Sequence, residues 1–498
     1  MSGSRSAASE LERHLTRREA LLHGVGGVAF VCSFDKLVKP NIRPSGKPSP
    51  ARRSPAASVF EPFRSVLPIP PVAQPETGGA VPRYEFTMQA GAVEILDGLE
   101  TPVLGYDGMF PGPSIRARRG DPIEVLQRNQ SGRDLNVHLH GGITAPDSDG
   151  HPDDFIPTGQ ERLYQYANRG RAATLWYHDH AHGQTAQTLY GGLAAFYLLS
   201  DERERSLDLP RGEYDVPLMI QDRSFNEDGS FRYVPNLDFG FYGDTILVNG
   251  ALAPRMLVKR GLYRLRLLNA SNARPYHLRL GNGRAMIQIA GDVGLLPRPV
   301  RRKSIQLQPA ERVEILVDFS EYRPGTKLVL QNTLGQGSTV AVMRFDVRKA
   351  RGDGGFRVPK RLQSLGGDLP EPVAERVFDL DITGVPTPRW EINGMGFDPS
   401  RIDATPQFGT TETWTFANQS ERIHPMHLHG YHFRIVSLGG KPPHDGDRGW
   451  KDTVGVLPGQ TVKVRPYFIE FPGRYVFHCH AAEHGDHDMF SQMEVEGA

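Results

Sequence analysis

The tripeptide His478-Cys479-His480, followed by His484 and Met489, holds the residues with the most distinctive chemistry in this sequence. Successive side chains of an extended strand point to opposite faces, so the two histidines should point one way and Cys479 the other. A cysteine thiolate, histidine and a weakly bound methionine thioether form the ligand set of a blue-copper electron-transfer site. The tripeptide could therefore serve two metal centres back to back, although a lone cysteine beside one histidine would more often be structural.

Four His-x-His pairs give the second signal, because each pair places two imidazoles on the same face of a strand. The pairs are His138/His140, His178/His180, His427/His429 and His478/His480. Imidazole suits copper, iron and zinc, and eight neutral imidazoles without a carboxylate suit a multinuclear copper cluster better than calcium, magnesium or manganese. One such pair could be incidental. Four pairs in matching places of two repeats predict a metal cluster between two domains.

The cysteine site needs a second histidine and a weak axial ligand. His424 stands shortly before the third histidine pair, and Pro425 restricts the backbone between them. His424 and His484 would complete the set around Cys479. Met489 could equally be a core residue, since methionine fills irregular gaps, but its place just behind the tripeptide favours the axial role.

A repeat of domain length organises the elements that must position these residues. The alternating segments 123–129, 263–269 and 413–418 each end in asparagine, roughly 140–150 residues apart. A short strand with histidine follows each one, and the middle copy lacks the histidine pairs. Short alternating strands between Gly and Pro turns, in a chain with 54 Gly and 40 Pro, are typical of β-sandwiches. We predict an all-β chain of three homologous sandwiches, at 81–205, 212–350 and 365–498.

The N-terminal region predicts export. Arg17-Arg18 precede a mildly apolar run of about 13 residues, shorter than the ~20 residues that span a bilayer. This pattern is typical of a twin-arginine signal, which we place at 1–35; an unstructured basic tail is the alternative. Residues 36–80 are rich in Pro, Ser and Ala and predict a linker or an arm on the surface.

Composition excludes several partners. A chain of 498 residues is too long for one hydrophobic core. Its formal net charge of +1 argues against a nucleic-acid or anionic-membrane partner. The two cysteines are Cys32 and Cys479. If the signal is removed, Cys479 remains alone and no internal disulfide can form.

Together these motifs resemble the three-domain multicopper oxidases, and within them the bacterial spore-coat laccase and bilirubin oxidase branch. The segments that carry the resemblance are 138–141 (HLHG), 176–180 (WYHDH), 424–430 (HPMHLHG) and 478–489 (HCHAAEHGDHDM), with further likeness at 243–250 and 449–453. The likeness covers nearly everything from about residue 60 onward. It implies cupredoxin-like Greek-key sandwiches that hold four copper ions per chain, with ligands in the first and third domains.

The resemblance also implies a role for each ligand. A type 1 copper would be bound by His424, Cys479, His484 and Met489. A type 2 copper would be bound by His138 and His427. The type 3 pair would be bound by His140, His178, His180, His429, His478 and His480.

The implied activity is that of a laccase-like copper oxidoreductase with oxygen as acceptor. A phenol, aromatic amine or tetrapyrrole would give electrons singly to the type 1 copper, and dioxygen would be reduced to water at the cluster. The expected partners are this small reductant, dioxygen and the twin-arginine export machinery. We expect a monomer in the periplasm or outside the cell.

Water formation also requires protons, and two acids are candidate catalytic residues. Asp149 matches an acidic residue placed near the cluster in this branch, although Asp149-Gly150 is also a turn signal. The branch often carries a glutamate directly after the second type 1 histidine, where this chain has Gly485. Glu483 is therefore the second candidate, with Asp486 close by.

Two other functions are open. A metal oxidase acting on Mn(II), Fe(II) or Cu(I) is one alternative. Relatives that handle copper often carry Met-rich inserts, because thioethers suit Cu(I), and this chain has 11 Met and no such insert. That weighs against Cu(I) and leaves Mn(II) open. A copper-free structural relative is the other alternative, but it should have lost ligands, and the set here is complete.

Overall fold

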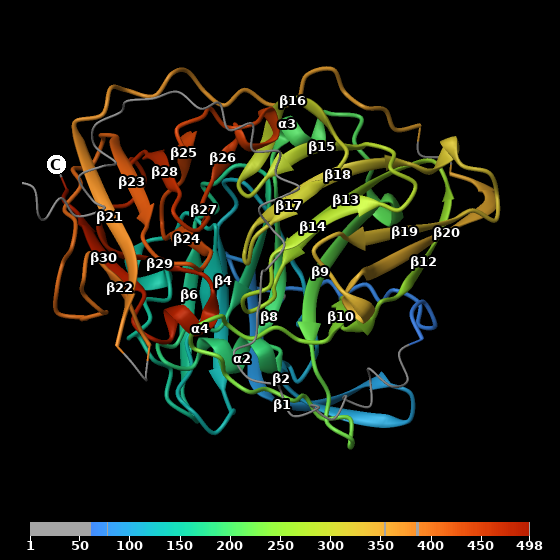
Figure 1. Cartoon of the computed structure of the whole chain (residues 1–498), viewed down its shortest axis with the longest axis horizontal. Coiled ribbons are helices and arrows are strands. Elements are labelled where there is room, and N and C mark those ends of the chain that lie inside the picture. Colours follow the sequence, from blue (N-terminus) through green and yellow to red (C-terminus); the bar gives the residue numbers. More distant parts are fainter. Residues whose placement is uncertain (1–60, 77, 353–354, 385–387, 498) are drawn as a thin grey trace, which may run out of the picture. The chain divides into compact units, whose positions relative to one another are not determined.

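The computed structural model describes residues 61–76, 78–352, 355–384 and 388–497. The signal predicted at 1–35 and residues 36–60 of the predicted arm lie outside the described residues. Strands predominate (Figure 1), so the all-β prediction is confirmed. The described α-helices are α2 (Thr185–Gly191), α3 (Glu202–Arg205) and α4 (Ala482–Gly485). None of these helices is long and apolar enough to cross a membrane.

The first sandwich consists of two four-stranded sheets. The sheet ordered β2-β1-β4-β6 contains β1 (Arg83–Leu96), β2 (Leu99–Tyr106), β4 (Ile123–Asn129) and β6 (Glu161–Tyr166). The sheet ordered β3-β8-β7-β5 contains β3 (Ile115–Arg118), β5 (His138–His140), β7 (Ala173–His178) and β8 (Ala194–Ser200). The sequence Arg-Tyr-Glu-Phe-Thr-Met at the start of β1 alternates between partly exposed and buried side chains, as one sheet face against a core requires. Phe86, Val125, Tyr177 and Tyr197 from the two sheets meet in that core.

The second sandwich is larger. The sheet ordered β11-β10-β9-β13-β18-β15-β16 contains β9 (Asp215–Arg223), β10 (Thr245–Val248), β11 (Ala251–Leu252), β13 (Leu262–Asn269), β15 (Met286–Gly291), β16 (Gly294–Arg302) and β18 (Arg312–Asp318). The sheet ordered β12-β20-β19-β14-β17 contains β12 (Arg255–Arg260), β14 (Tyr276–Leu280), β17 (Ile305–Leu307), β19 (Lys327–Asn332) and β20 (Ala341–Arg351). Its core is almost wholly aliphatic and aromatic.

The third sandwich holds the C-terminal strands. The sheet ordered β22-β21-β23-β28-β25-β26 contains β21 (Ala374–Thr383), β22 (Arg389–Ile392), β23 (Glu412–Asn418), β25 (Phe433–Leu438), β26 (Trp450–Lys451) and β28 (Thr461–Pro466). The sheet ordered β27-β24-β29-β30 contains β24 (His424–Leu428), β27 (Thr453–Val456), β29 (Gly473–Cys479) and β30 (Phe490–Val495). The 3₁₀ turns between strands are η2 (Pro146–Ser148), η3 (Gly212–Tyr214), η4 (Phe319–Glu321), η5 (Gly337–Thr339) and η6 (Asp445–Asp447).

The three sandwiches repeat the same pairing. In each, the strand that ends in the repeated asparagine runs parallel to the first long strand of its sandwich: β4 beside β1, β13 beside β9 and β23 beside β21. The domain boundaries at 81–205, 212–350 and 365–498 stay predictions.

The described part of the predicted arm lies along later strands. The N–H of Leu67 donates to the carbonyl of Arg255 in the second sandwich at 2.8 Å. The N–H of Ala73 donates to the carbonyl of Ser114 in the first sandwich at 2.9 Å. Because Leu67 is also buried in the second core, this segment ties the two sandwiches together.

Candidate metal centre

The histidine pairs lie on neighbouring strands in two of the sandwiches. In the first sandwich, β5 and β7 are antiparallel, and His138 lies opposite His178. In the third, β24 and β29 are antiparallel, and His427 lies opposite His478. Paired strands place opposite side chains on the same face, so each sandwich presents its imidazoles together. The matching middle strands, β14 and β19, carry no His-x-His pair in their sequence.

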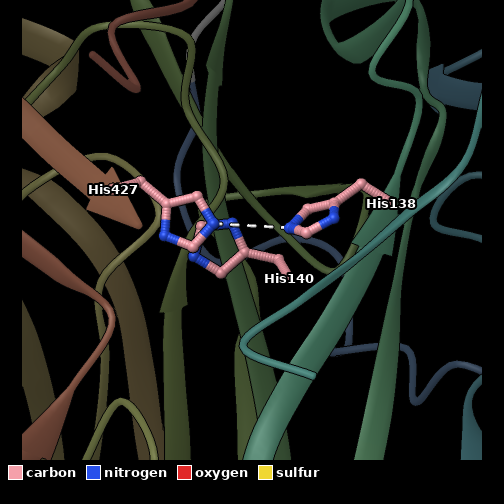
Figure 2. A group of neighbouring side chains, drawn as sticks. All are labelled: His138, His140 and His427. Atoms are coloured by element: carbon pink, nitrogen blue, oxygen red, sulfur yellow. Dashed lines mark hydrogen bonds between the residues drawn. The ribbon is translucent and has the colours of Figure 1, made fainter. Parts of the chain in front are cut away.

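All eight rings of the four pairs are buried, with at most 4% of any residue exposed. Their ligand atoms form groups in which all atoms lie within 4.8 Å of one another. The groups are His138, His140 and His427; His140, His178 and His480; and His180, His429 and His478. Every group joins the first and third sandwiches. Figure 2 shows the first group, in which the Nε2 atoms of His138 and His427 are 3.3 Å apart.

Outward hydrogen bonds fix which ring nitrogen most of these histidines present. Nδ1–H donates to a main-chain carbonyl at 2.6–3.0 Å in His138, His178, His427 and His478. In His429 it donates to the Asp149 carboxylate at 2.7 Å. The Nε2 lone pairs of these five rings therefore face inward. The Nε2 atom of His478 lies 3.1 Å from that of His180 and 3.2 Å from that of His429, a separation that suits ligands at about 2.0–2.1 Å from one ion.

The donors fit a transition metal. His140 Nδ1, His178 Nε2 and both ring nitrogens of His480 are buried without a hydrogen-bond partner among the described residues. Burial lowers the pKa of all eight imidazoles, and neighbouring cluster histidines lower it further in most. The rings are therefore neutral near pH 7, as metal binding requires. Asp149 also forms a group with His138 and His429, but it faces their outer Nδ1 atoms. The donors that face inward are neutral nitrogens, which suit copper.

A second group gathers around the cysteine. Cys479 Sγ lies 3.5 Å from His424 Nδ1 and 3.7 Å from His484 Nδ1. The outer nitrogens are occupied: His424 Nε2 bonds the Ser420 hydroxyl at 2.8 Å, and His484 Nε2 donates to the Asp238 carbonyl at 3.2 Å. Both Nδ1 lone pairs therefore point at the sulfur.

Met489 lies beside this group. It is fully buried, its N–H donates to the His484 carbonyl at 3.1 Å, and its carbonyl accepts from the Cys479 N–H at 3.0 Å. Burial raises the pKa of the Cys479 thiol. A bound metal would therefore have to displace the thiol proton to gain a thiolate ligand.

Strand β29 joins the two sites. Cys479 belongs to the mononuclear group, whereas His478 and His480 belong to two different groups of the cluster. This is the division expected from the alternation of side chains in an extended strand. A few covalent bonds therefore separate the two sites.

Asp149 lies against the cluster. Its Oδ2 accepts from His429 Nδ1–H at 2.7 Å, and its Oδ1 accepts from the Thr144 hydroxyl at 2.8 Å. Burial raises the pKa of Asp149 to about 7, although the Thr144 hydrogen bond opposes the shift. Asp149 also ends the 3₁₀ turn η2 before Gly150, whose φ is +76°. Asp149 is therefore both a turn residue and an acid in contact with the cluster.

Glu483 is placed differently. Its Oε1 accepts from the Tyr233 hydroxyl and from the Asn272 amide of the second sandwich, each at 2.9 Å. It belongs to none of the donor groups formed by the described residues. Asp486 accepts from the N–H groups of Thr185 and Ala186 and caps α2. The proton-transfer roles of Asp149 and Glu483 stay predictions.

Packing accounts for Gly485, where the family branch often has glutamate. A Cβ at this position would lie 3.0 Å from the Phe490 ring and 3.2 Å from the Cys479 carbonyl. Phe490 in turn stacks on His478 with ring centroids 4.3 Å apart. The phenyl ring therefore leaves little room for a longer side chain at Gly485.

Several residues that orient the ligands were not predicted from the sequence. Ser420 and Asp238 hold the outer nitrogens of the cysteine site, and the Trp390 ring lies 4.1 Å from that of His484. Asp452 contacts the cluster from a loop. Ser420 follows the repeated asparagine, and Asp452 lies in the segment 449–453 that resembles the family branch, so both had a usable signal. Nothing local marks Asp238 or Trp390.

Comparison with known proteins agrees with this geometry. Sequence profiles described as multicopper oxidase match residues 371–498 and 87–196. The laccase of Bacillus subtilis is 36% identical, over 88% of this chain and 99% of its own length. The bilirubin oxidase of Albifimbria verrucaria is 33% identical, over 87% of this chain and 81% of its own length. The crystal structure of the laccase from Pediococcus acidilactici superposes with a TM-score of 0.80 at 32% identity, covering 87% of this chain and 95% of that one.

The chain belongs to the multicopper oxidase family. The resemblance inferred from the motifs is confirmed, as is the fold class of cupredoxin-like sandwiches. The protein is a copper oxidoreductase that uses oxygen. Its histidine clusters are typical of multicopper oxidase copper sites, and the Cys-His group suggests type 1 copper.

Proposed function

We propose that this multicopper oxidase is a laccase, which couples one-electron oxidation of phenols, aromatic amines or tetrapyrroles to the four-electron reduction of dioxygen to water. The observation that carries the proposal is the tripeptide at the end of β29, because Cys479 lies in the mononuclear group while His478 and His480 lie in the cluster. A copper-free relative would have no reason to keep this set. The similarity to a laccase and to a bilirubin oxidase supports the same substrate classes.

The proposed division of the donors follows the family motifs. We assign the type 1 copper to His424, Cys479, His484 and Met489. We assign the type 2 copper to His138 and His427. We assign the type 3 pair to His140, His178 and His480 on one side and His180, His429 and His478 on the other. When bound, copper would supply one-electron redox chemistry at the first site and oxygen reduction at the cluster.

The chain itself holds the donors rigidly and keeps bulk water away. Cys479, His424 and His484 are each at most 1% exposed. Such fixed burial reduces the rearrangement that accompanies a change in ligand charge. Asp149 would hold a proton on a carboxylate oxygen beside His429 and release it near neutral pH.

The reductant would approach His484 from the surface. The Asp238 carbonyl bonds His484 Nε2, and the neighbouring Phe239 side chain is partly exposed. Phe239 lies under the Arg422 guanidinium at 3.6 Å. An aromatic reductant would pack against this edge, next to the carbonyl that bonds His484.

Copper counting and oxygen uptake test the proposal. Protein loaded with copper should hold four ions per chain. It should consume one dioxygen per four electrons from a dimethoxyphenol, an aromatic diamine or bilirubin, without releasing peroxide. Mn(II), Fe(II) and Cu(I) belong in the same panel, since turnover of a metal ion alone would favour the metal-oxidase alternative. Absence of copper after loading would favour the copper-free alternative.

A further inference from the structure

Asp452 lies between β26 and β27 and bonds two stacked histidines of the cluster, one from the first sandwich and one from the third. Its Oδ1 accepts from His140 Nε2–H at 3.1 Å, and its main-chain carbonyl accepts from His427 Nδ1–H at 2.9 Å. The Thr453 hydroxyl bonds the same Oδ1 at 2.8 Å and lies 3.2 Å from His140 Nε2. His140 is therefore turned the opposite way from the five rings that bond outward through Nδ1.

Arg312 of the middle sandwich holds Asp452. Its Nη1 donates to Asp452 Oδ1 at 2.8 Å, and its Nη2 donates to Oδ2. Its Nε donates to the Thr174 carbonyl of the first sandwich at 3.0 Å. Both partners are fully buried. The two terminal N–H groups of the guanidinium thus meet both oxygens of the carboxylate, which is the two-point geometry of an arginine–carboxylate pair.

Gly141 shows that the space around this pair is filled. A Cβ at Gly141 would lie 2.5 Å from Asp452 Oδ2 and 2.6 Å from Arg312 Nη2. Its φ is +80°, which also favours glycine. Because Gly141 has no side chain, the Asp452–Arg312 pair can lie next to His140.

We propose that Asp452, held by Arg312, is a positioning residue that keeps the His140 proton on Nε2 and so presents Nδ1 to the metal. The inference rests on the proposed copper cluster. His140 lies in a donor group with His178 and His480, and its Nδ1, which has no hydrogen-bond partner among the described residues, is the nitrogen left to bind their ion. The copper-free middle sandwich thereby acquires a role in the site, because its arginine links the first and third sandwiches at the cluster.

The substitution Asp452→Asn tests this with nearly the same shape. Arg312 donates to both carboxylate oxygens, so an asparagine leaves its N–H₂ facing an arginine N–H in either orientation. With the N–H₂ toward His140, Nε2 has to accept and its proton moves to Nδ1. With the amide oxygen toward His140, a neutral acceptor replaces a charged one, so the preference for Nε2–H is weaker. We expect the ring ¹⁵N shifts of copper-free, histidine-labelled protein to show Nε2–H for His140 in the wild type and to change in Asp452→Asn, with His140→Gln giving the assignment.

Copper binding gives a second readout. Asp452→Asn should weaken uptake into the cluster by about 10–100-fold, as is usual when a partner behind a metal ligand is removed, while the blue absorption stays. Asp215→Asn is the matched control. Asp215 forms a slightly less buried pair with Arg266, at 2.7 and 3.0 Å, and makes no hydrogen bond to the histidines of the cluster. It should lower the unfolding midpoint without changing copper affinity.

Three results would overturn the inference. One is a wild-type His140 that carries its proton on Nδ1, which can be measured even if Asp452→Asn does not fold. Another is unchanged His140 shifts in a folded Asp452→Asn. The third is equal copper loss in Asp452→Asn and Asp215→Asn, which would make Asp452 only structural. If the wild type takes up no copper at all, the proposed function fails, but the copper-free spectra still decide the role of Asp452.

Discussion

Burial decides the state of single residues in both sites. It keeps the histidines neutral and ready to bind, but it also keeps the Cys479 thiol protonated until a metal arrives. Copper must therefore supply the free energy that drives the thiol proton off. In the proposed type 1 site, the Cys479 sulfur would be both a copper ligand and the start of the covalent link to the cluster.

Replacing Cys479 by serine should abolish the intense blue colour of copper-loaded protein, because the colour arises from thiolate-to-copper charge transfer. Laccase activity should disappear with it. Copper counting should find about three ions per chain, since the cluster histidines are untouched. A wild-type protein that is fully loaded with copper but colourless would contradict the type 1 assignment.

Replacing Met489 by leucine should keep the copper but raise its reduction potential. A weak axial thioether donates some electron density to Cu(II), so its removal favours Cu(I). Leucine conserves the volume of this buried position, and the expected loss of stability is less than about 1.5 kcal/mol. Redox titration followed at the blue band measures the change. An unchanged or lowered potential would show that Met489 is a core residue only.

Replacing Asp149 by asparagine should slow reoxidation of the reduced enzyme by oxygen by about 10²-fold or more, because an amide cannot serve as a general acid. Anaerobic reduction of the blue site by substrate should keep its wild-type rate. Stopped-flow absorbance follows both steps. Asp147→Asn, on the exposed side of the same turn, is the control and should change neither. Fast reoxidation of Asp149→Asn with full copper occupancy would leave Asp149 as a turn residue.

At the scale of elements, one repeated corner builds all three sandwiches. The side chains of Asn129, Asn269 and Asn418 each donate to two main-chain carbonyls and accept from the N–H two residues ahead. Such buried amide bonds fix where the strand ends. In the third sandwich alone, the serine of the corner also contacts a metal ligand, since Ser420 bonds both Asn418 and His424.

Replacing Ser420 by alanine should therefore disturb the blue site. The Ser420 hydroxyl donates to Asn418 and accepts from His424 Nε2–H, which leaves Nδ1 free to face Cys479. Without it, type 1 copper affinity should fall by about 10-fold or more, with a shift of the blue band. Ser131→Ala, at the matching corner of the first sandwich, should lower stability by about 0.5–1.5 kcal/mol and leave the band unchanged. Equal spectra for the two variants would refute the orienting role.

At the scale of the whole molecule, the sequence predicts those features that come from repeated segments or from alternating residue types. The asparagine repeat predicted the three sandwiches, and the period of two in His-x-His predicted which imidazoles share a face. The histidines do gather in groups of three, although His140 lies both with His138 and His427 and with His178 and His480. The assignment of each ligand to a copper type stays a prediction.

Contacts between distant segments had no such signal. Arg312 and Asp452 are 140 positions apart, and Arg264, Arg266, Asp215 and Glu314 form a buried ion-pair network that no local pattern marks. Asp238 reaches His484 from the second sandwich through its carbonyl, which any residue could offer. These contacts depend on how the sandwiches pack against one another. That packing depends on the shapes of the side chains that meet, which the spacing of residues along the sequence does not reveal.

The neutral histidines predict how the whole copper-free protein responds to acid. Their folded pKa values are lowered by burial, to about 3 in His178 and about 4 in His427, against 6.5 when unfolded. The unfolded chain therefore binds more protons, and stability present above pH 6.5 is lost as pH falls toward the folded values. Each such histidine contributes about 1.4 kcal/mol per pH unit across that window.

The buried carboxyl groups act in the opposite sense. Burial raises the pKa of Asp149 to about 7 and of Asp179 to about 6. Their ionisation therefore lowers the free energy of unfolding as pH rises toward these values. The shifted histidines outnumber them among the described residues, so the net stability should fall steeply between pH 6.5 and 5. Urea unfolding of copper-free protein at several pH values measures this. As a control, His444→Gln removes an exposed histidine and should leave the dependence of stability on pH unchanged. Copper-loaded protein should stay folded to lower pH, because bound metal competes with protons for the histidines. If the free energy of unfolding of copper-free protein does not change from pH 7 to 5, the fold does not hold these histidines neutral. The idea that the cluster is formed before copper binds would then be wrong.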